Sequence, residues 1–460
     1  MADHDPRDQF ATARYPGRGV KELFEEDTRD VPDMYREDSW RYLGSEPLDA
    51  DRYTSREFFE LEKKRMWPRV WQFAAREEEM PEPGDFVVYE NVGKSYLLVR
   101  QDDGSIKTFH NVCLHRGRKL RLESGFADEF ECPFHGFTWD MKGDLKRVPC
   151  RWDFAHLEDK DMSLPEVRTE SFQGYIYINE DGKAPPLEEY LAPLPEHFAR
   201  WRYEECSTAL WIGKVIPANW KVVSEAFMEA WHSVVTHPQI LPFTGDENTR
   251  YSLWGDHVNL ALTPSGILSP HVENEMTEAD VLNAISGGFR NGEGADKIVI
   301  PEGMDARKML AETNREKLRE LGYDADDAAD TEMLDNWTYN VFPNHAPWGS
   351  FVINIVYRWR PWPDENHTLM EVRLLQRAPK GETLTRAPEM RLLGPDEPWT
   401  AVEDWGALGE VFEQDMSNLP YVQDGLHAHP TGKVELGNYQ ESRIRHFHRT
   451  MDKYLAMGNA

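Results

Sequence analysis

The spacing of hydrophobic and polar residues divides the chain into regions of different character. Residues 1–50 carry many charges and several prolines without a sustained hydrophobic period, which predicts an extended N-terminal arm. From Ser55, aromatic and leucine residues separated by Glu and Lys predict a helix that leads into a first strand. Between about 80 and 180, short alternating runs separated by glycines predict a small all-β domain. The last run, Gly174 to Ile178, is followed by turn residues, so we place a boundary near 185.

The remainder of the chain mixes both periods. Helical patterns are expected at 219–236, 398–418 and 440–456, and alternating strands at 338–343, 350–360 and 368–377. Strands between groups of helices favour an α+β domain with a mainly antiparallel sheet. We therefore predict an arm at 1–50, a β domain at 51–185 and a larger domain at 186–460.

Composition and charge restrict the classes of partner. The 52 Lys and Arg against 82 Asp and Glu give a net charge of −30, which repels phosphate backbones and anionic lipid surfaces. Nucleic acid is therefore not an expected partner. No apolar run reaches the length of a membrane span and the N-terminus lacks a signal-like segment, so we expect a cytoplasmic protein without membrane contact. Four cysteines are too few to staple 460 residues.

Two of these cysteines form a first candidate metal site with two histidines. Cys113 and His115 are followed, after sixteen intervening residues, by Cys132 and His135. Two thiols and two imidazoles on two loops of the β domain could hold a structural zinc ion, or a [2Fe–2S] cluster with thiolates on one iron and imidazoles on the other.

The spacing favours the cluster over zinc. A zinc finger usually pairs Cys with Cys and His with His, whereas here each loop carries one Cys followed by one His. Each loop also contains a glycine, Gly117 or Gly136, which lets backbone N–H groups approach sulfur closely. The pattern Cys-x-His-x16-Cys-x2-His resembles the Rieske motif, and mixed ligation of this kind suits a one-electron relay.

Other residues near or outside this motif receive separate interpretations. Cys150 and Cys206 are expected to be small buried hydrophobes. A run of basic residues follows the first loop: Arg116, Arg118, Lys119 and Arg121. It is either a solvated face or a docking site for an acidic electron donor, because a local patch can steer a partner despite an unfavourable total charge.

A second candidate site lies on the predicted helix 219–236. Glu225, Glu229 and His232 share one narrow arc away from the apolar stripe, for which solvent exposure is the plain alternative. His237 lies five residues after His232, and a straight helix would point the two rings about 140° apart. Pro238 disfavours helical geometry at His237, so the second imidazole can turn back toward the first. Two imidazoles and one carboxylate form the facial triad of non-haem Fe(II) oxygenases.

The third ligand must come from elsewhere in the chain. The helical neighbours of Asp415 are Val411, Phe412, Met416 and Leu419. An ionised carboxylate on an apolar stripe is costly unless it is paired or bound to a metal. Asp415 is therefore our candidate.

The two sites together resemble the catalytic α subunit of Rieske non-haem iron ring-hydroxylating oxygenases, along nearly the whole chain from about residue 40. The matching motifs are the Cys/His pattern, Asn219-Trp220-Lys221, the acid-x2-His-x4-His pattern at 229, 232 and 237, and Gln414-Asp415 followed by Val422-Gln423. The resemblance implies an N-terminal all-β Rieske domain and a helix-grip catalytic domain with an antiparallel sheet. It identifies His232, His237 and Asp415 as ligands of one mononuclear Fe(II), and Cys113, His115, Cys132 and His135 as ligands of one [2Fe–2S] cluster per subunit.

The resemblance also implies an assembly. In the family, the Rieske cluster of one subunit lies against the mononuclear iron of its neighbour in a head-to-tail trimer, with or without a β subunit. A carboxylate links the two centres, and Glu229 occupies the matching position as a catalytic residue. The sequence departs from the pattern twice: the family usually has Asp where Glu229 stands, and Pro420 occupies a position where many members carry Glu. We expect the helix to end or kink at Pro420.

The predicted function is that of a terminal oxygenase component. It would use O2 and NAD(P)H-derived electrons to hydroxylate or dihydroxylate an aromatic or other hydrophobic substrate. Because no dinucleotide-binding fingerprint follows a strand, the electrons are expected through a separate ferredoxin, a flavin reductase or both. Phe227, Met228 and Trp231, with the strands at 260–262 and 351–353, could line an apolar pocket or could be ordinary core.

Two other classes of function stay open at this stage. An electron carrier would have the Rieske site without the facial triad. A zinc-stabilised binding protein would use the same cysteines and histidines without iron.

Overall fold

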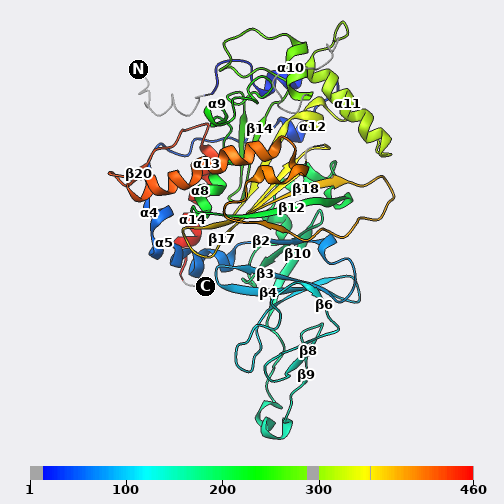
Figure 1. The fold of residues 1–460 in the computed structure, drawn as a ribbon, viewed down its shortest axis with the longest axis vertical. Helices are drawn as coiled ribbons and strands as arrows, with labels where there is room; N and C mark the ends of the chain where they lie inside the picture. The colour runs from blue at the N-terminus through cyan, green and yellow to red at the C-terminus, as the bar shows by residue number, and fades with distance from the viewer. Residues whose placement is uncertain (1–13, 287–299, 353, 459–460) are drawn as a thin grey trace, which may run out of the picture.

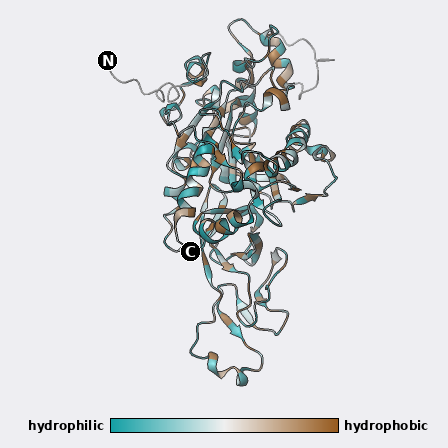
Figure 2. Ribbon diagram, turned by 90° about the vertical axis from the view of Figure 1, so that its left-hand side faces the viewer, coloured by the Kyte–Doolittle hydropathy of each residue, from teal (hydrophilic) through white to brown (hydrophobic). Residues whose placement is uncertain are grey.

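The chain is elongated, with two β-rich bodies following one another along its long axis (Figure 1). The structure is a computed structural model that describes residues 14–286, 300–352 and 354–458. The lower body tapers to a narrow end that carries β8 (Thr138–Asp140) and β9 (Leu145–Arg147). Figure 2 shows the same taper after a quarter turn about the long axis.

The lower body is an all-β domain, as the alternating runs predict. Its seven-stranded sheet has the order β2-β11-β10-β5-β4-β3-β6 with antiparallel neighbours. The strands are β2 (Gln72–Arg76), β3 (Asp85–Asn91), β4 (Lys94–Arg100), β5 (Ile106–His110), β6 (Gly125–Phe126), β10 (Glu166–Phe172) and β11 (Tyr175–Asn179). A three-stranded sheet adds β7 (Glu129–Glu131) to β8 and β9. Helical segments precede the large sheet at α4 (Asp51–Thr54), α5 (Arg56–Leu61), η1 (Glu62–Met66) and η2 (Trp67–Arg69).

The upper body contains an eight-stranded sheet of order β13-β14-β15-β16-β17-β18-β12-β19. Every pair is antiparallel except β12 with β19, so the prediction of a mainly antiparallel sheet in an α+β domain is confirmed. The strands are β12 (Cys206–Ile216), β13 (Arg250–Trp254), β14 (Val258–Thr263), β15 (Asn336–Val341), β16 (His345–Gly349), β17 (Ile355–Pro361), β18 (Thr368–Arg377) and β19 (Arg391–Leu393).

Helices cover this sheet, and Figure 1 shows α13 lying across it. The helices include α6 (Leu187–Tyr190), α7 (Leu194–Phe198), α8 (Trp220–Glu225), α9 (Ser233–Thr236), α10 (Glu278–Ser286), α11 (Ala306–Glu320), α12 (Asp330–Leu334), α13 (Leu408–His427) and α14 (Ser442–Ala456). In the described ranges no helix combines the length and apolar character that crossing a membrane requires.

The described part of the arm is not simply extended. It forms α2 (Val20–Glu26) and α3 (Asp33–Arg36), and β1 (Leu48–Asp49) pairs with β20 (Lys433–Val434). Phe24 and Tyr35 are buried against Trp337 of β15, with ring centroids 6.5 Å and 4.8 Å away. A short apolar stripe on α2, hidden among many charges, is enough to anchor the arm on the upper body.

Two helix predictions need correction. The single helix expected at 219–236 ends at Glu225, and only four residues, Ser233–Thr236, return to helix after a turn. The helix expected at 398–418 instead spans Leu408–His427, so of the two outcomes expected at Pro420, an end or a kink, the end is wrong: the proline lies inside the helix. A proline costs one backbone hydrogen bond, and here packing of the helix against the sheet outweighs that loss.

A polar joint holds the two bodies together. Arg358 and Arg360 of β17 donate to the backbone carbonyls of Ala74 and Glu90 in the lower body. Both arginines also bind the buried carboxylate of Glu371, at 2.6 Å and 2.7 Å. Because Arg358, Arg360 and Glu371 are buried, separating the bodies would leave the guanidinium N–H groups that bind Ala74 and Glu90 without their acceptors.

Candidate metal centres

The two Cys/His loops adopt the same backbone arrangement. The amides of Cys113 and Cys132 each donate to the carbonyl five residues later, at 2.8 Å, and their carbonyls each accept from a glycine amide four residues later, at 2.9 Å. These glycines, Gly117 and Gly136, have φ of 78° and 71°, a conformation that side chains disfavour. The repeated turn explains why each loop needs a glycine four positions after its cysteine.

The four predicted side chains of these loops come together. Both thiols are buried, and burial and the neighbouring Cys132 raise the pKa of Cys113. The rings of His115 and His135 lie 4.7 Å apart between centroids, and Phe137 stacks on His115. Nδ1 of His115 is buried and has no hydrogen-bond partner among the described residues. A buried nitrogen beside buried thiols fits a metal ligand.

The spread of these ligands argues against a single ion. Within the described ranges, only His232, His237 and Asp415 bring three candidate ligand atoms within 4.8 Å of one another. The ligands of one tetrahedral zinc ion would meet that limit, because each lies about 2.0–2.3 Å from the metal. A two-iron cluster spreads its four ligands over two atoms, which fits the Cys/His loops better.

This first site lies near the surface of the tapered end. His135 is exposed, and its ring is 3.8 Å from that of Phe134, which is 55 % exposed. Trp152, on a 3-10 turn nearby in the chain, is 82 % exposed. Exposed aromatic side chains of this kind are typical of a surface that meets another protein.

The basic run and the two remaining cysteines behave differently from one another. Arg121 donates to the carbonyls of Glu129 and Glu131, so it stabilises the second loop, while Lys119 pairs with Glu90 at 2.5 Å. Cys206 is buried as expected. Cys150 is exposed, which contradicts the prediction of a buried hydrophobe, because it occupies a left-handed turn at the domain surface.

The second set of predicted residues converges in the upper body. Nε2 of His237 lies 2.8 Å from Oδ1 of Asp415, and Nε2 of His232 lies 3.5 Å from the same oxygen. The two rings are 5.2 Å apart between centroids. The break after α8 gives His232 freedom from the straight helix, so both imidazoles face one carboxylate from α13.

Each imidazole is held at its other nitrogen. Nδ1–H of His232 donates to Glu229 Oε1 at 2.7 Å, and the backbone amide of His232 donates to the other carboxylate oxygen. Nδ1–H of His237 donates to Oε1 of Gln414 at 2.8 Å, which also accepts from Gln239 at 2.7 Å. These bonds fix the tautomer in which Nε2 of each ring carries a lone pair.

The donor set fits a cation. With both Nδ1–H groups engaged, two Nε2 lone pairs face the acceptor oxygen of Asp415, which requires a proton or a metal ion between them. Burial lowers the pKa of His232, but the carboxylates of Glu229 and Asp415 outweigh it and raise its pKa to about 10. Burial raises the pKa of Asp415, but its contacts with His232 and His237 outweigh this and hold it below its usual value. In the metal-free chain protons would take the place of the cation.

Amide hydrogen bonds connect the two segments that carry these ligands. Asn219 caps α8 by accepting from the amide of Lys221 at 3.0 Å. Its own backbone amide donates to Oε1 of Gln423 on α13 at 2.8 Å. The start of α8 is also tied to η1, because Lys221 and Trp220 both bind the buried carboxylate of Glu62. The ligands are therefore held by helices whose relative position is fixed.

An aromatic layer lies beside the second site. Phe227 contacts Tyr357 with centroids 4.8 Å apart, and Tyr357 contacts Phe412 of α13 at 6.2 Å. Burial and the Asp415 carboxylate raise the pKa of Tyr357, which places its ring near the triad. Of the residues suggested for a pocket, Phe227 belongs to this layer.

The other residues suggested for a pocket lie elsewhere. Met228 is in the core with Trp67 and Trp220, and Leu260 and Leu262 belong to a separate core cluster. Phe351 and Val352 pack near α11 and α12, Trp231 is 47 % exposed, and Ile353 lies outside the described residues.

The roles of some residues around the site were not predicted from the sequence. Gln414 and Gln239 support His237, and Tyr357 lies close to Asp415. The signal for Gln414 was its position next to Asp415, but nothing local indicated its partner. Glu225, on the same expected arc as Glu229, instead binds Tyr53 and His448 in a separate buried network.

Comparison with known proteins identifies both parts of the chain. A family model described as ring hydroxylating alpha subunit (catalytic domain) matches residues 194–457, and one described as Rieske [2Fe-2S] domain matches residues 70–158. The large oxygenase component of the naphthalene 1,2-dioxygenase system of Pseudomonas putida is 30 % identical over 434 residues, covering 88 % of this chain and 90 % of that protein. The carnitine monooxygenase oxygenase subunit of Acinetobacter baumannii is 29 % identical over 189 residues, covering 40 % and 51 %.

Solved structures share the fold. A naphthalene 1,2-dioxygenase variant bound to phenanthrene aligns with a TM-score of 0.65 and 20 % identity, over 92 % of this chain and 95 % of that one. A quaternary ammonium Rieske monooxygenase with bound L-carnitine aligns with a TM-score of 0.62 and 19 % identity, over 89 % and 95 %.

Proposed function

Because this chain belongs to the ring-hydroxylating alpha subunits and carries a Rieske [2Fe–2S] domain, we propose that the two groups of side chains described above are its metal sites. The chain is the terminal oxygenase component of a Rieske oxygenase, an oxidoreductase that incorporates oxygen from O2. We assign the cluster to Cys113, His115, Cys132 and His135, and the mononuclear iron to His232, His237 and Asp415.

One observation carries the second assignment. Two imidazoles, each locked at Nδ1 by an acceptor, direct Nε2 at a single buried carboxylate oxygen. Three acceptors facing one point repel one another unless a cation lies between them. A 2-His-1-carboxylate set leaves coordination positions for O2 and substrate, which is the arrangement of non-haem Fe(II) oxygenases.

The residues of the site have separate tasks. When bound, the mononuclear iron supplies activation of O2 and the Rieske cluster supplies single electrons. Asp415 supplies negative charge from a buried position, so it binds the cation without competition from bulk water. Glu229 and Gln414 keep His232 and His237 in the correct tautomer and orientation. Phe227, Tyr357 and Phe412 form an apolar wall that suits a hydrophobic substrate.

The placement of the two sites supports electron transfer between chains. The first site belongs to the tapered lower end, and the second lies among α8, α9 and α13 of the upper body (Figure 1). We propose a head-to-tail homotrimer in which the tapered end of one chain meets Trp231 and Val235 of the next, which are 47 % and 85 % exposed. Glu229 would link the two centres across that contact, in addition to holding His232.

We propose an aromatic or similarly hydrophobic substrate, electrons from NAD(P)H through a ferredoxin, a flavin reductase or both, and a cytoplasmic location. The aromatic layer supports the substrate class, and the free thiols of the chain support a reducing compartment. The names of the relatives, a naphthalene dioxygenase and a carnitine monooxygenase, give the two substrate classes that an experiment must distinguish: an aromatic hydrocarbon and a quaternary ammonium compound.

The test begins with anaerobic purification, a visible spectrum and assays for iron and acid-labile sulfide. O2 uptake is then measured with a surrogate reductase against naphthalene, smaller arenes and L-carnitine. We expect a brown protein whose O2 uptake depends on an aromatic compound and yields a hydroxylated product. Zinc in place of iron would refute both metal assignments, whereas turnover of L-carnitine alone would refute only the proposed substrate class. Mass measurement in solution tests the trimer and shows whether a β subunit accompanies it.

A further inference from the structure

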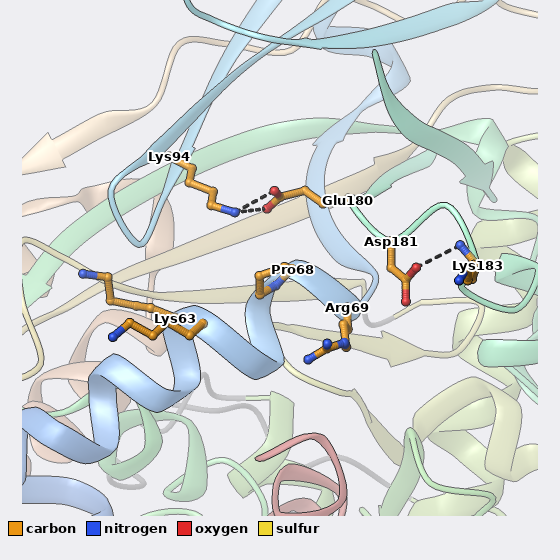
Figure 3. Close-up of a pocket in the computed structure, with 8 residues that line it drawn as sticks. Lys63, Pro68, Arg69, Lys94, Glu180, Asp181 and Lys183 are labelled. Atoms are coloured by element: carbon orange, nitrogen blue, oxygen red, sulfur yellow. Dashed lines mark hydrogen bonds and ion pairs between the residues drawn. The ribbon is translucent and has the colours of Figure 1, made fainter. Parts of the chain in front are cut away.

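A basic groove opens at the edge of the lower body where η1 and η2 meet the ends of β4 and β11 (Figure 3). Its volume is about 800 Å³. Five of its eight lining residues are basic and two are acidic: Lys63, Lys64, Pro68, Arg69, Lys94, Glu180, Asp181 and Lys183. The groove contains none of the residues assigned to either metal site, and nothing in the proposed chemistry uses it.

Several of these positive charges are not neutralised locally. Lys94 binds Glu180 at 2.6 Å, and Glu180 also accepts from Tyr96. Lys63 pairs with Glu60 at 3.0 Å. In the described part of the chain, the ammonium groups of Lys64 and Lys183 have no carboxylate partner, although the backbone amide of Lys183 donates to Asp181 (Figure 3), and Arg69 donates only to backbone carbonyls. A surplus of positive charge in a protein of net charge −30 creates a local potential of opposite sign to its surroundings.

The groove continues toward the first metal site. A second, smaller groove of about 330 Å³ shares Lys63 and Lys94 with it and extends to Lys119. Lys119 belongs to the loop that follows Cys113 and His115. Asn111 ties that loop to the start of β4, because it donates to Ser95 and to the carbonyl of Arg121. Although Lys119 itself is paired with Glu90, the groove and the loop that follows Cys113 are thus parts of one continuous surface.

We propose that this basic groove docks the acidic face of a [2Fe–2S] electron-transfer protein that reduces the Rieske cluster. This inference rests on the proposed function. In each encounter the donor is oxidised by one electron and the cluster of this chain is reduced by one, without bond changes.

The distribution of charge favours a protein partner. The cations come from η1, η2, β4 and the end of β11, with two carboxylates among them, so they match several separated carboxylates better than one compact phosphate. Contact through a charged groove also suits a donor that must bind quickly and leave after one electron.

The test compares two double variants of the holoenzyme with equal total charge. K64E/K183E reverses two exposed groove lysines, and K21E/K380E reverses two exposed lysines elsewhere in the chain. The probe is a plant-type acidic [2Fe–2S] ferredoxin. Its affinity in the oxidised state is measured by titration calorimetry across a salt series, and the rate at which its reduced form reduces the Rieske cluster is followed by stopped flow.

We expect K64E/K183E to weaken ferredoxin binding by about tenfold at low salt and to flatten its salt dependence, with K21E/K380E within about twofold of the unmodified chain. Equal affinity of the two variants would overturn the inference, as would absence of binding to the unmodified enzyme. A change in oligomeric mass in K64E/K183E with unchanged ferredoxin affinity would instead assign the groove to contact between copies.

Photoreduction with a small deazaflavin distinguishes a failure of the docking proposal from a failure of the proposed function. A cluster that is bleached by the deazaflavin in all variants shows that the metal assignment holds while docking is tested. No bleaching and no cluster spectrum in the unmodified chain would refute the proposed function itself.

Discussion

The two proposed metal sites of this chain differ in how far they are exposed to solvent. The Cys/His loops lie at the tapered end, where His135 and Phe134 are exposed. The His/His/Asp site is more enclosed: Asp415 and His237 are buried, the His232 side chain is half-buried, and each imidazole is supported by an internal acceptor. An electron relay has to touch another protein, whereas activation of O2 has to be protected from solvent. The contrast predicts that mutations at the two sites fail in different ways.

The largest effect is expected at the enclosed site. Asp415→Ala removes the carboxylate on which both imidazoles converge, so mononuclear iron and substrate-dependent O2 uptake should be lost. The visible spectrum of the cluster should not change, because the two sites share no ligand. Iron and sulfide assays with the visible spectrum check this, and Asp424→Ala on the exposed side of α13 is the matched control. Retained turnover in Asp415→Ala would remove this residue from the ligand set.

The converse change is made at the tapered end. Cys132→Ser should eliminate the cluster spectrum and turnover with any reductase, because a weaker ligand replaces one of two buried thiolates. Binding of Fe(II) at the enclosed site should persist and is measured by electron paramagnetic resonance of its nitric oxide adduct. Loss of both signals would show that the two sites are not independent.

A smaller effect is expected at the proposed link between chains. Glu229→Gln removes a negative charge but keeps an acceptor for His232, so we expect turnover to fall by about 10- to 100-fold with iron content nearly unchanged. Glu229→Asp restores the charge one methylene shorter and should recover part of the rate. Single-turnover kinetics of cluster oxidation measure the step directly. Equal rates for Glu229→Gln and the unmodified chain would exclude the link.

The support behind His237 should matter less. Gln414→Leu removes the acceptor for Nδ1–H of His237 and should lower Fe(II) affinity by about tenfold. Gln414→Glu keeps an acceptor at that position and is the control expected to retain affinity. Fe(II) titration of both variants provides the measurement. Equal affinity in Gln414→Leu would show that Gln414 does not orient the ring.

The smallest effect is expected on the exposed surface of the tapered end. Trp152→Ala should change the free energy of unfolding by less than about 0.5 kcal/mol, since its side chain is 82 % exposed. If this end meets a neighbouring chain, the same change should weaken the trimer, which sedimentation at several protein concentrations would detect. A weaker monomer fold with an unchanged trimer would contradict both expectations.

Residues whose roles depend on local sequence were predictable, and those that depend on distant partners were not. The spacing of Cys113, His115, Cys132 and His135 indicated two loops. Each loop is a local turn of six residues, closed by a hydrogen bond from the cysteine amide to the carbonyl five positions later. The strands near 338–343 and 368–377 and the helix 440–456 were also found, since each has a clear period. The all-β character of the lower body and these strands and this helix of the upper body were therefore predicted.

The errors have physical causes. The helix 219–236 kept its apolar period through a turn, so periodicity could not reveal the break after Glu225. Gln414 binds His237 from 177 positions away, and no local pattern encodes such a contact. Pro420 is tolerated because tertiary packing of α13 outweighs its local cost.

The polar joint between the bodies determines which subunit of a proposed ring would lose activity when the joint is damaged. Arg358 and Arg360 hold the lower body, and with it the tapered end, in a fixed direction relative to the sheet of the upper body. In a head-to-tail ring, a chain whose tapered end points in the wrong direction could still oxidise substrate with electrons from its other neighbour. The chain that depends on its cluster would receive no electrons. Mixing such a subunit with one lacking Asp415 should therefore reveal which protomer supplies electrons to which. The first defect affects the chain that donates electrons across the contact, and the second affects the chain that accepts them.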